Sequence, residues 1–375
     1  MKKIGIITFQ RAHNYGASLQ AYALQRILEK KDYDVKFINY IDKEIDKNYR
    51  IFRIYSGNII IKLKSIISSI IYFDKNKKRY SNFESFINHK LKLTEKYKTL
   101  NELKNNSPQL DCYITGSDQV WNPDITNGLS DAYTLNFGSD KINRVSYAAS
   151  IGKSSLGQED YKTKLSRLNY ISVREKTAKD LLEPVLNRSI EVVLDPTLLV
   201  SGGEWESYFN LKNNINEKYI LAYRVENNEE YVKIVNELSR KTNLKVINFE
   251  KRDRHSYVNF MKSAYTEGPE EFVRLIKNAE YVVTTSFHAT VFSILFHKRF
   301  FVVPHKTTGS RVTDLIDKLH IKNRIYYTID EFKAYTNYKE EVDYTESDKN
   351  LLEEREKSIN FLEEAIDGKK EDIHE

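Results

Sequence analysis

The chain has 375 residues, of which 40% are hydrophobic and 30% charged, as expected of a soluble globular protein with two ordinary domains. The single cysteine, Cys112, excludes a disulfide framework within the chain and fits a cytoplasmic location, and no apolar run reaches the roughly 18 residues of a membrane span. The net charge of +6 is compatible with an anionic small molecule or membrane surface as partner, but no motif for nucleic-acid binding accompanies it.

The first half of the chain alternates short apolar strands with helical patterns. Residues 3–9 predict a buried first strand and not a signal peptide, because the start of the chain becomes polar too soon. A polar loop over 10–16 precedes a helix with apolar positions at Leu19, Ala23, Leu24 and Leu28. Further strands are predicted at 34–40, 112–115, 144–149, 170–173 and 192–194. This order implies a parallel sheet with right-handed crossovers.

The segment 41–105 does not follow this alternation of strands and helices. Between residues 50 and 80 it carries eight Lys or Arg against one Asp, around the apolar run 57–73. Two interpretations are open, and they do not exclude each other. One is a helical insertion packed on the first domain, and the other is a basic amphipathic helix on the inner face of the cytoplasmic membrane.

The second half repeats the alternation of strands and helices. Strands are predicted at 219–225, 244–249, 281–285 and 299–303, and helices at 229–240, from Gly268 onwards, at 290–297 and at 312–319. A charged helix over 344–366 ends the pattern and is expected to cross back over the first domain. We therefore predict two Rossmann-like parallel-sheet α/β domains that face a cleft, over 1–196 (with the insertion 41–105) and 197–340, followed by the tail 341–375.

Ligands of parallel sheets bind at the carboxyl ends of the strands, which directs attention to four polar loops. In the first loop, Asn14 and Gly16 stand at the start of a helix, where backbone amides can bind an anion. The alternative is a capping turn in which Asn14 or Ser18 satisfies free amides. The second loop contains Ser117, Asp118 and Gln119. Asp118 is a candidate to accept a proton or hold a sugar hydroxyl, with a capping role as the alternative.

The third and fourth loops contain Arg174 and His288. Arg174 closes an apolar strand, where its guanidinium can bind a carboxylate or phosphate, or else form an ion pair with Glu175 or Asp195. His288 follows a buried strand among small hydroxyl residues, at the start of the next helix. That position suits a catalytic imidazole, although a lone histidine is more often structural.

Several motifs are missing from the sequence. It contains no HExxH, no Cys/His cluster with zinc spacing and no GxSxG. We therefore expect no metal site and no serine hydrolase chemistry.

The segments GIITFQRAHNYGASLQAYALQ, DCYITGSDQVWNP, SYAASIG, ISVREKTA, VLDPTLL and TTSFHATVFSILFHKRFFVV together resemble the polysaccharide pyruvyl transferase family, in the family's order and over about residues 3–320. The resemblance implies a fold similar to the GT-B glycosyltransferases. It implies phosphoenolpyruvate as donor, a sugar or lipid-linked oligosaccharide of a capsule or exopolysaccharide as acceptor, a pyruvate ketal as product, and no metal or organic cofactor. By this resemblance, Arg174 matches a family arginine. His288 is then the expected general acid or phosphate contact, and Asp118 is the expected base.

One position departs from the family pattern. Many relatives place an arginine two residues before this histidine, where this chain has Ser286. We expect Arg311, which precedes a helix, to supply the missing positive charge, with Ser286 also contacting the substrate. If no arginine replaces the missing one, the alternative is a GT-B glycosyltransferase with a nucleotide-sugar donor.

Overall fold

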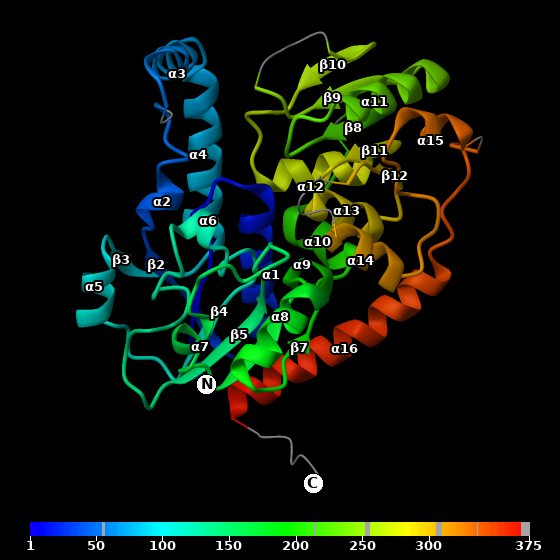
Figure 1. The fold of residues 1–375 in the computed structure, drawn as a ribbon. Helices are drawn as coiled ribbons and strands as arrows, with labels where there is room; N and C mark the ends of the chain where they lie inside the picture. The colour runs from blue at the N-terminus through cyan, green and yellow to red at the C-terminus, as the bar shows by residue number, and fades with distance from the viewer. Residues whose placement is uncertain (55–56, 214, 252–255, 305–309, 336, 369–375) are drawn as a thin grey trace. The chain divides into compact units, whose positions relative to one another are not determined.

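The structure is a computed structural model that describes residues 1–54, 57–213, 215–251, 256–304, 310–335 and 337–368. The chain forms two compact units (Figure 1). The first contains residues 1–53, 84–200 and 353–375, and the second contains residues 54–83 and 201–352. Two long helices, α4 (Phe73–Lys90) and α16 (Thr345–Asp367), contribute residues to both units.

The first unit is built on a sheet of seven parallel strands in the order β3-β2-β1-β4-β5-β6-β7. Its strands are β1 (Lys3–Ile7), β2 (Asp34–Tyr40), β3 (Leu93–Tyr97), β4 (Cys112–Thr115), β5 (Asn143–Ala149), β6 (Tyr170–Val173) and β7 (Glu191–Val192). The central strands are apolar on both faces because helices cover both sides of a parallel sheet. Every residue of β4 is buried, for example, and burial raises the pKa of the Cys112 thiol to about 12.

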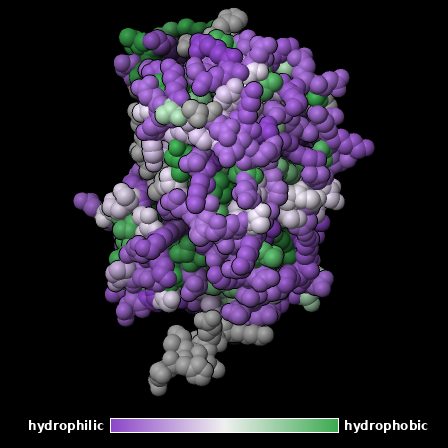
Figure 2. Space-filling view, turned by 90° about the vertical axis from the view of Figure 1, so that its right-hand side faces the viewer, coloured by the Kyte–Doolittle hydropathy of each residue, from purple (hydrophilic) through white to green (hydrophobic). Residues whose placement is uncertain are grey.

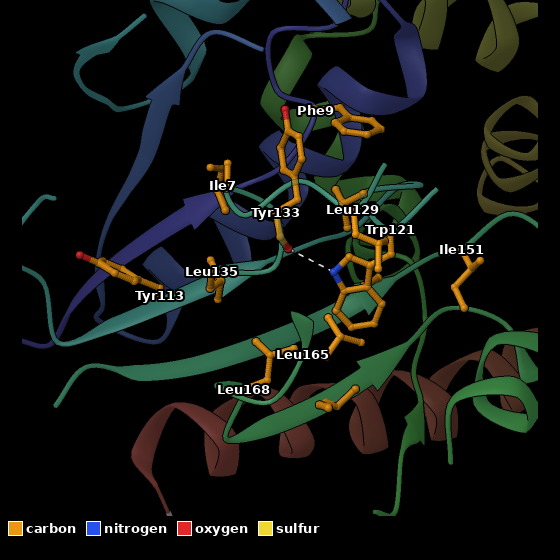
Figure 3. Close-up of a cluster of buried hydrophobic side chains, with 14 of the residues drawn as sticks. Ile7, Phe9, Tyr113, Trp121, Leu129, Tyr133, Leu135, Ile151, Leu165 and Leu168 are labelled. Carbon is orange, nitrogen blue, oxygen red and sulfur yellow. Dashed lines mark hydrogen bonds between the residues drawn. The ribbon is translucent and has the colours of Figure 1, made fainter. Parts of the chain in front are cut away.

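The helices of the first unit are α1 (Tyr15–Lys30), α2 (Lys43–Asp46), α5 (Leu100–Asn105), α6 (Pro123–Thr126), α7 (Tyr161–Lys164), α8 (Lys176–Leu186) and α9 (Pro196–Leu199). A hydrophobic core fills the space beside the sheet, and Figure 3 shows part of it. Trp121 is fully buried there, and its indole nitrogen donates to the carbonyl oxygen of Tyr133 at 3.1 Å. The tryptophan of the loop after β4 is therefore a core residue that anchors this loop.

The second unit has a sheet of five parallel strands in the order β10-β9-β8-β11-β12. Its strands are β8 (Tyr219–Tyr223), β9 (Lys245–Asn248), β10 (Phe260–Ser263), β11 (Tyr281–Thr284) and β12 (Arg299–Val302). Its helices are α3 (Ile59–Ile71), α10 (Gly202–Phe209), α11 (Glu229–Thr242), α12 (Pro269–Asn278), α13 (Phe287–Leu295), α14 (Ser310–Lys318) and α15 (Ile329–Ala334). The prediction of two parallel-sheet α/β domains is confirmed.

Several local expectations were wrong. The strand predicted at 192–194 is the two-residue β7, and β3 and β10 had no counterpart among the predicted strands. α13 begins at Phe287, three residues earlier than predicted, so that His288 lies inside its first turn. The segment 41–105, assigned to the first domain from sequence, is divided, and residues 54–83 group with the second unit.

Among the described residues, none of the helices combines the length and the apolarity that crossing a membrane requires. The face of the molecule in Figure 2 is mostly hydrophilic, with hydrophobic residues in small groups.

Candidate functional site

Each sheet has one point at which the strand order reverses direction, and this is where open α/β sheets bind ligands. In the first sheet the point lies between β1 and β4, and in the second between β8 and β11. The segments that follow these four strands contain Asn14, Asp118, Arg224 and His288. Three of these four segments had been singled out from sequence.

In the first unit a hydrogen bond joins the two loops at the reversal point. The hydroxyl of Thr8, just after β1, donates to the carbonyl oxygen of Ser117, just after β4, at 2.7 Å. Gly116, before that serine, has a φ of +113°, and a Cβ atom there would lie 2.2 Å from the carbonyl oxygen of Tyr147. Only glycine fits this position, which fixes the path of the loop that contains Asp118.

Arg174, Ser117 and Asp195 form a buried hydrogen-bonded cluster. Arg174 Nη1 donates to Asp195 Oδ2 at 2.8 Å, and Ser117 Oγ donates to the same oxygen at 3.1 Å. The Arg174 side chain is only 3% exposed. Burial by itself would lower the pKa of Arg174, but the carboxylates of Asp195 and Asp118 raise it above its ordinary value. This geometry is the ion pair that the sequence left as the alternative, and a contact between Arg174 and the substrate stays a prediction.

Asp118 is half-buried, and its Oδ1 accepts a hydrogen bond from the backbone amide of Gln119 at 2.8 Å. The side chain of Gln119 accepts from Asn122 Nδ2 at 2.7 Å. The side chains of Ser117, Asp118 and Gln119, on one loop, thus each have a hydrogen-bond partner in the first unit. Their roles toward a substrate stay predictions.

Arg11 and His13, in the loop after β1, form a cluster with Glu84. Glu84, on α4, accepts from Arg11 Nη2 at 2.8 Å and lies 3.0 Å from His13 Nε2. Burial by itself would raise the pKa of Glu84, but the hydrogen bond with His13 and the charge of Arg11 hold it below its usual value. The position of Arg11 and His13 after a strand was visible in the sequence. The contact with Glu84 could not be predicted, because Glu84 lies some 70 residues away along the chain.

Asn14 caps α1. It has an extended backbone, and its side chain accepts from the backbone amide of Ala17 at 3.2 Å, while Gly16 is buried in the first helical turn. No acidic residue lies in that turn, so the positive end of the helix dipole is not offset there. Asn14 is therefore the N-cap of α1, as the alternative interpretation of the sequence had it.

In the second unit, hydrogen bonds also join the two loops at the reversal point. The hydroxyl of Thr284 donates to the carbonyl oxygen of Tyr223 at 2.7 Å, and the backbone amide of Val225 donates to the hydroxyl of Thr285 at 2.9 Å. Thr284 and Thr285 thus hold the loop after β8 next to the end of β11, where Thr285 lies three residues before His288.

His288 is half-buried in the first turn of α13, next to the N-cap residue Ser286. The hydroxyl of Ser286 accepts from the backbone amide of Ala289 at 3.4 Å. Ser286, which stands where many relatives have an arginine, is thus the N-cap of α13. α14, with Arg311 in its first turn, contacts α13, so Arg311 and His288 lie on neighbouring helices of the same unit.

Arg224 is a residue of this region that the sequence reading missed. It follows β8, and its Nη2 forms an ion pair with Glu250 Oε1 at 2.7 Å, where the hydroxyl of Tyr257 also donates at 2.7 Å. An arginine directly after a strand was a usable signal, because Arg174 had been selected on the same ground.

The structure brings the predicted residues together in two groups. Ser117, Asp118 and Arg174 belong to the first unit with Asn14, Gly16 and Gln119, and Ser286, His288 and Arg311 belong to the second. A site that combines the two groups stays a prediction. Within the described ranges, no group of three or more His, Cys, Asp or Glu side chains could hold a metal ion.

The family model of polysaccharide pyruvyl transferases matches residues 14–307 of the chain. This range runs from the start of α1 in the first unit to the region after β12 in the second, and so includes Asp118 and His288. No curated protein matches the sequence.

Solved structures share the fold at low sequence identity. A UDP-GlcNAc 2-epimerase from Neisseria meningitidis, bound to UDP-GlcNAc, matches with a TM-score of 0.50 and 14% identity over 98% of this chain and 100% of that one. The putative UDP-N-acetylglucosamine 2-epimerase from Listeria monocytogenes matches with a TM-score of 0.54 and 11% identity, over 98% of this chain and 97% of that one. The enzyme from Rickettsia bellii matches with a TM-score of 0.53 and 10% identity, over 100% and 99%. These similarities show a GT-B-like fold.

Proposed function

The chain belongs to the polysaccharide pyruvyl transferase family, and on that premise we propose that it transfers the pyruvyl group of phosphoenolpyruvate to a sugar of a bacterial surface polysaccharide. The product is a pyruvate ketal that bridges two hydroxyls, and phosphate is released. The observation that carries this proposal is the family match over 14–307, a range that includes the proposed acid, His288, and the proposed base, Asp118.

The reaction needs one acid, one base and a site for two anionic groups. An acid donates a proton to the methylene carbon C3 of the donor, which makes C2 electrophilic. One sugar hydroxyl then adds to C2 and gives its proton to a base. The second hydroxyl displaces phosphate, which leaves with its bonding electron pair and takes up the remaining proton. Well-placed acid and base groups each contribute about 10²–10⁴-fold to such a reaction.

His288 is the proposed general acid. It lies in the first turn of α13, whose backbone amides and dipole favour a bound anion, and no acidic residue occupies that turn. A phosphate group held there would stand next to the imidazole. Asp118, on a loop fixed by Gly116, is the proposed base.

The carboxylate and the phosphate of the donor need positive partners. Arg311, on the helix next to α13, is proposed to replace the arginine that the chain lacks at Ser286. Arg174 is proposed to bind the donor from the first unit while Asp195 orients its guanidinium. Asn14, Gly16, Ser117, Gln119 and Ser286 are proposed as further substrate contacts. The enzyme is proposed to act in the cytoplasm, without metal or organic cofactor, on a sugar or lipid-linked oligosaccharide.

The serine at position 286 supports one alternative function. Without the arginine of the family pattern, the same scaffold could take a nucleotide sugar as donor and act as a glycosyltransferase. Because the two donors differ chemically, ligand binding distinguishes the two functions.

The experiment is thermal unfolding of the full chain with phosphoenolpyruvate, UDP, GDP or inorganic phosphate. A ligand of the native state at 100 times its Kd stabilises the protein by about 2.7 kcal/mol, so a clear rise in Tm is expected with phosphoenolpyruvate at millimolar concentration. No rise with phosphoenolpyruvate contradicts the proposal, and a rise with UDP or GDP alone supports the glycosyltransferase.

The role of His288 is tested by phosphate release in the presence of donor and acceptor. His288→Gln is expected to lower kcat by about 10²–10⁴-fold, while the donor still raises the Tm. The matched control is His297→Gln, because His297 is 53% exposed and paired with Asp348 on the surface of the second unit. Equal activities of the two variants would rule out His288 as the acid.

A further inference from the structure

Helix α3 (Ile59–Ile71) buries polar residues and exposes apolar ones, the reverse of an ordinary surface helix. The residues that it buries are Ser65 and Ser69. The opposite face consists of Ile60, Leu63, Ile67, Ile70 and Ile71, and these side chains are 50–67% exposed. A helix of a globular protein normally buries such an apolar stripe.

The segment that contains α3 holds most of the exposed large hydrophobic residues among those that the structure describes. Among the described residues, 14 large hydrophobic residues are exposed, and ten of them lie between residues 52 and 73. Single exposed hydrophobic residues are common, but a contiguous apolar patch marks a binding surface.

Contacts of the neighbouring helix α4 hold this region in place. Arg79 Nη1 donates to the carbonyl oxygen of Tyr265 at 2.8 Å, and Asn82 Nδ2 donates to that of Thr266 at 2.8 Å. The hydroxyl of Tyr265 donates to Asn76 Oδ1 at 3.1 Å. In Figure 1, α3 crosses the end of α4. The second unit therefore presents α3 on a fixed support.

The charges around the apolar face are almost all positive. Lys62 and Lys64 lie on α3 itself, and Lys75, Lys77 and Lys78 follow in the first turns of α4. Asp74 is the single acidic residue of the segment 57–80. An apolar stripe flanked by lysines has the chemistry that recognises the interface of an anionic bilayer.

We propose that α3 binds the surface of a membrane containing anionic phospholipid, with its isoleucine face in the interfacial region and the lysines at the level of the headgroups. The helix has 13 residues and is therefore about 20 Å long, too short to cross a hydrocarbon core of about 30 Å but suited to lie in the plane of the interface. A second copy of the chain is the less favourable partner, because it would bring the same positive charges against these lysines.

The experiment is flotation of the full chain with vesicles of phosphatidylcholine, alone or mixed with phosphatidylglycerol. No donor or acceptor is present, so the result is independent of the proposed enzymatic reaction. The wild-type chain is expected to float with the mixed vesicles and much less with phosphatidylcholine alone.

Replacing Ile60, Ile67 and Ile70 by Ser should weaken binding roughly tenfold for each residue. Lys64→Gln with Lys77→Gln should weaken it about fivefold for each lysine.

The matched control removes exposed apolar residues elsewhere in the second unit. Tyr327 and Leu352 are 57% and 56% exposed, and Tyr327→Ser with Leu352→Ser is expected to leave flotation unchanged. Equal losses in the control and in the isoleucine variant would overturn the proposal. Light scattering that shows a dimer without lipid, dissociated by the isoleucine variant, together with no flotation of the wild-type chain, would also overturn it and assign the face to a second copy.

Discussion

Arg174 carries a positive charge that Asp195 balances inside the first unit. Both side chains are nearly inaccessible to solvent, at 3% and 0% exposure. Removal of one partner of a buried ion pair leaves the other charge uncompensated, which costs about 3–5 kcal/mol. Arg174→Met is therefore expected to lower the free energy of unfolding by that amount, measured by urea denaturation.

The double variant Arg174→Met with Asp195→Leu provides the control for this prediction. It removes both charges and is expected to recover part of the lost stability. If Arg174→Met alone changes the free energy of unfolding by less than about 0.5 kcal/mol, the pair is not structural and Arg174 acts only toward a ligand.

Glu84 links the stability of the first unit to pH. Its pKa in the folded protein is below its usual value, so the carboxylate stabilises the fold above about pH 4.3, the pKa of a glutamate in the unfolded chain. This contribution is lost as the pH falls through the lower pKa of the folded protein. The difference in unfolding free energy between wild type and Glu84→Gln is expected to be full at pH 7 and to shrink below about pH 4, measured by urea unfolding across this range.

The exposed residue Glu356 supplies the control, and Glu356→Gln is expected to change the unfolding free energy by less than about 0.5 kcal/mol. A difference between wild type and Glu84→Gln that increases on acidification would contradict the interaction of Glu84 with Arg11 and His13.

At the scale of elements, the start of α1 combines a helix cap with a proposed anion site. Asn14→Ala removes the cap and is expected to cost about 1 kcal/mol of stability. Asn14→Asp keeps the cap and is expected to stay within about 0.5 kcal/mol of wild type, but its negative charge should raise the KM for phosphoenolpyruvate. Thermal unfolding and steady-state kinetics of both variants test these expectations. An unchanged KM in Asn14→Asp would remove Asn14 from the donor site.

At the scale of the whole molecule, the last helix, α16, joins the first unit from Glu353 onwards. Asn143 Nδ2 donates to the carbonyl oxygen of Ala365 at 2.7 Å, and the backbone amide of Leu194 donates to Ser358 Oγ at 3.0 Å. Leu362 is 1% exposed on this helix. Leu362→Ala is therefore expected to cost about 2–5 kcal/mol, measured by chemical denaturation.

The same helix supplies a matched control at Leu352, which is 56% exposed. Leu352→Ala is expected to stay within about 0.5 kcal/mol of wild type. Equal effects of the two substitutions would mean that the last helix does not pack as the structure shows.

Short-range patterns made the strands and their parallel order predictable. The bounds predicted for β2, β4 and β6 agree with the structure. β4 and β6 are short apolar runs, whereas β2 includes polar residues alongside its buried Val35, Phe37 and Ile38. β3 and β10 were missed because they carry few fully buried residues and lie at sheet edges, where hydrogen bonds to a neighbouring strand define them more than hydrophobicity does.

The sequence by itself determined the fold class, the family and the loops in which the polar residues gather, because hydrophobic periodicity and motif order are local properties of the chain. Only the tertiary structure decided which partner each of these side chains contacts. Asp195 neutralises Arg174, Glu84 joins Arg11 to His13, and Ser286 caps a helix. The exposure of the α3 isoleucines was also a tertiary outcome. An amphipathic pattern shows that a helix has an apolar face, but packing against the rest of the chain decides whether that face is buried.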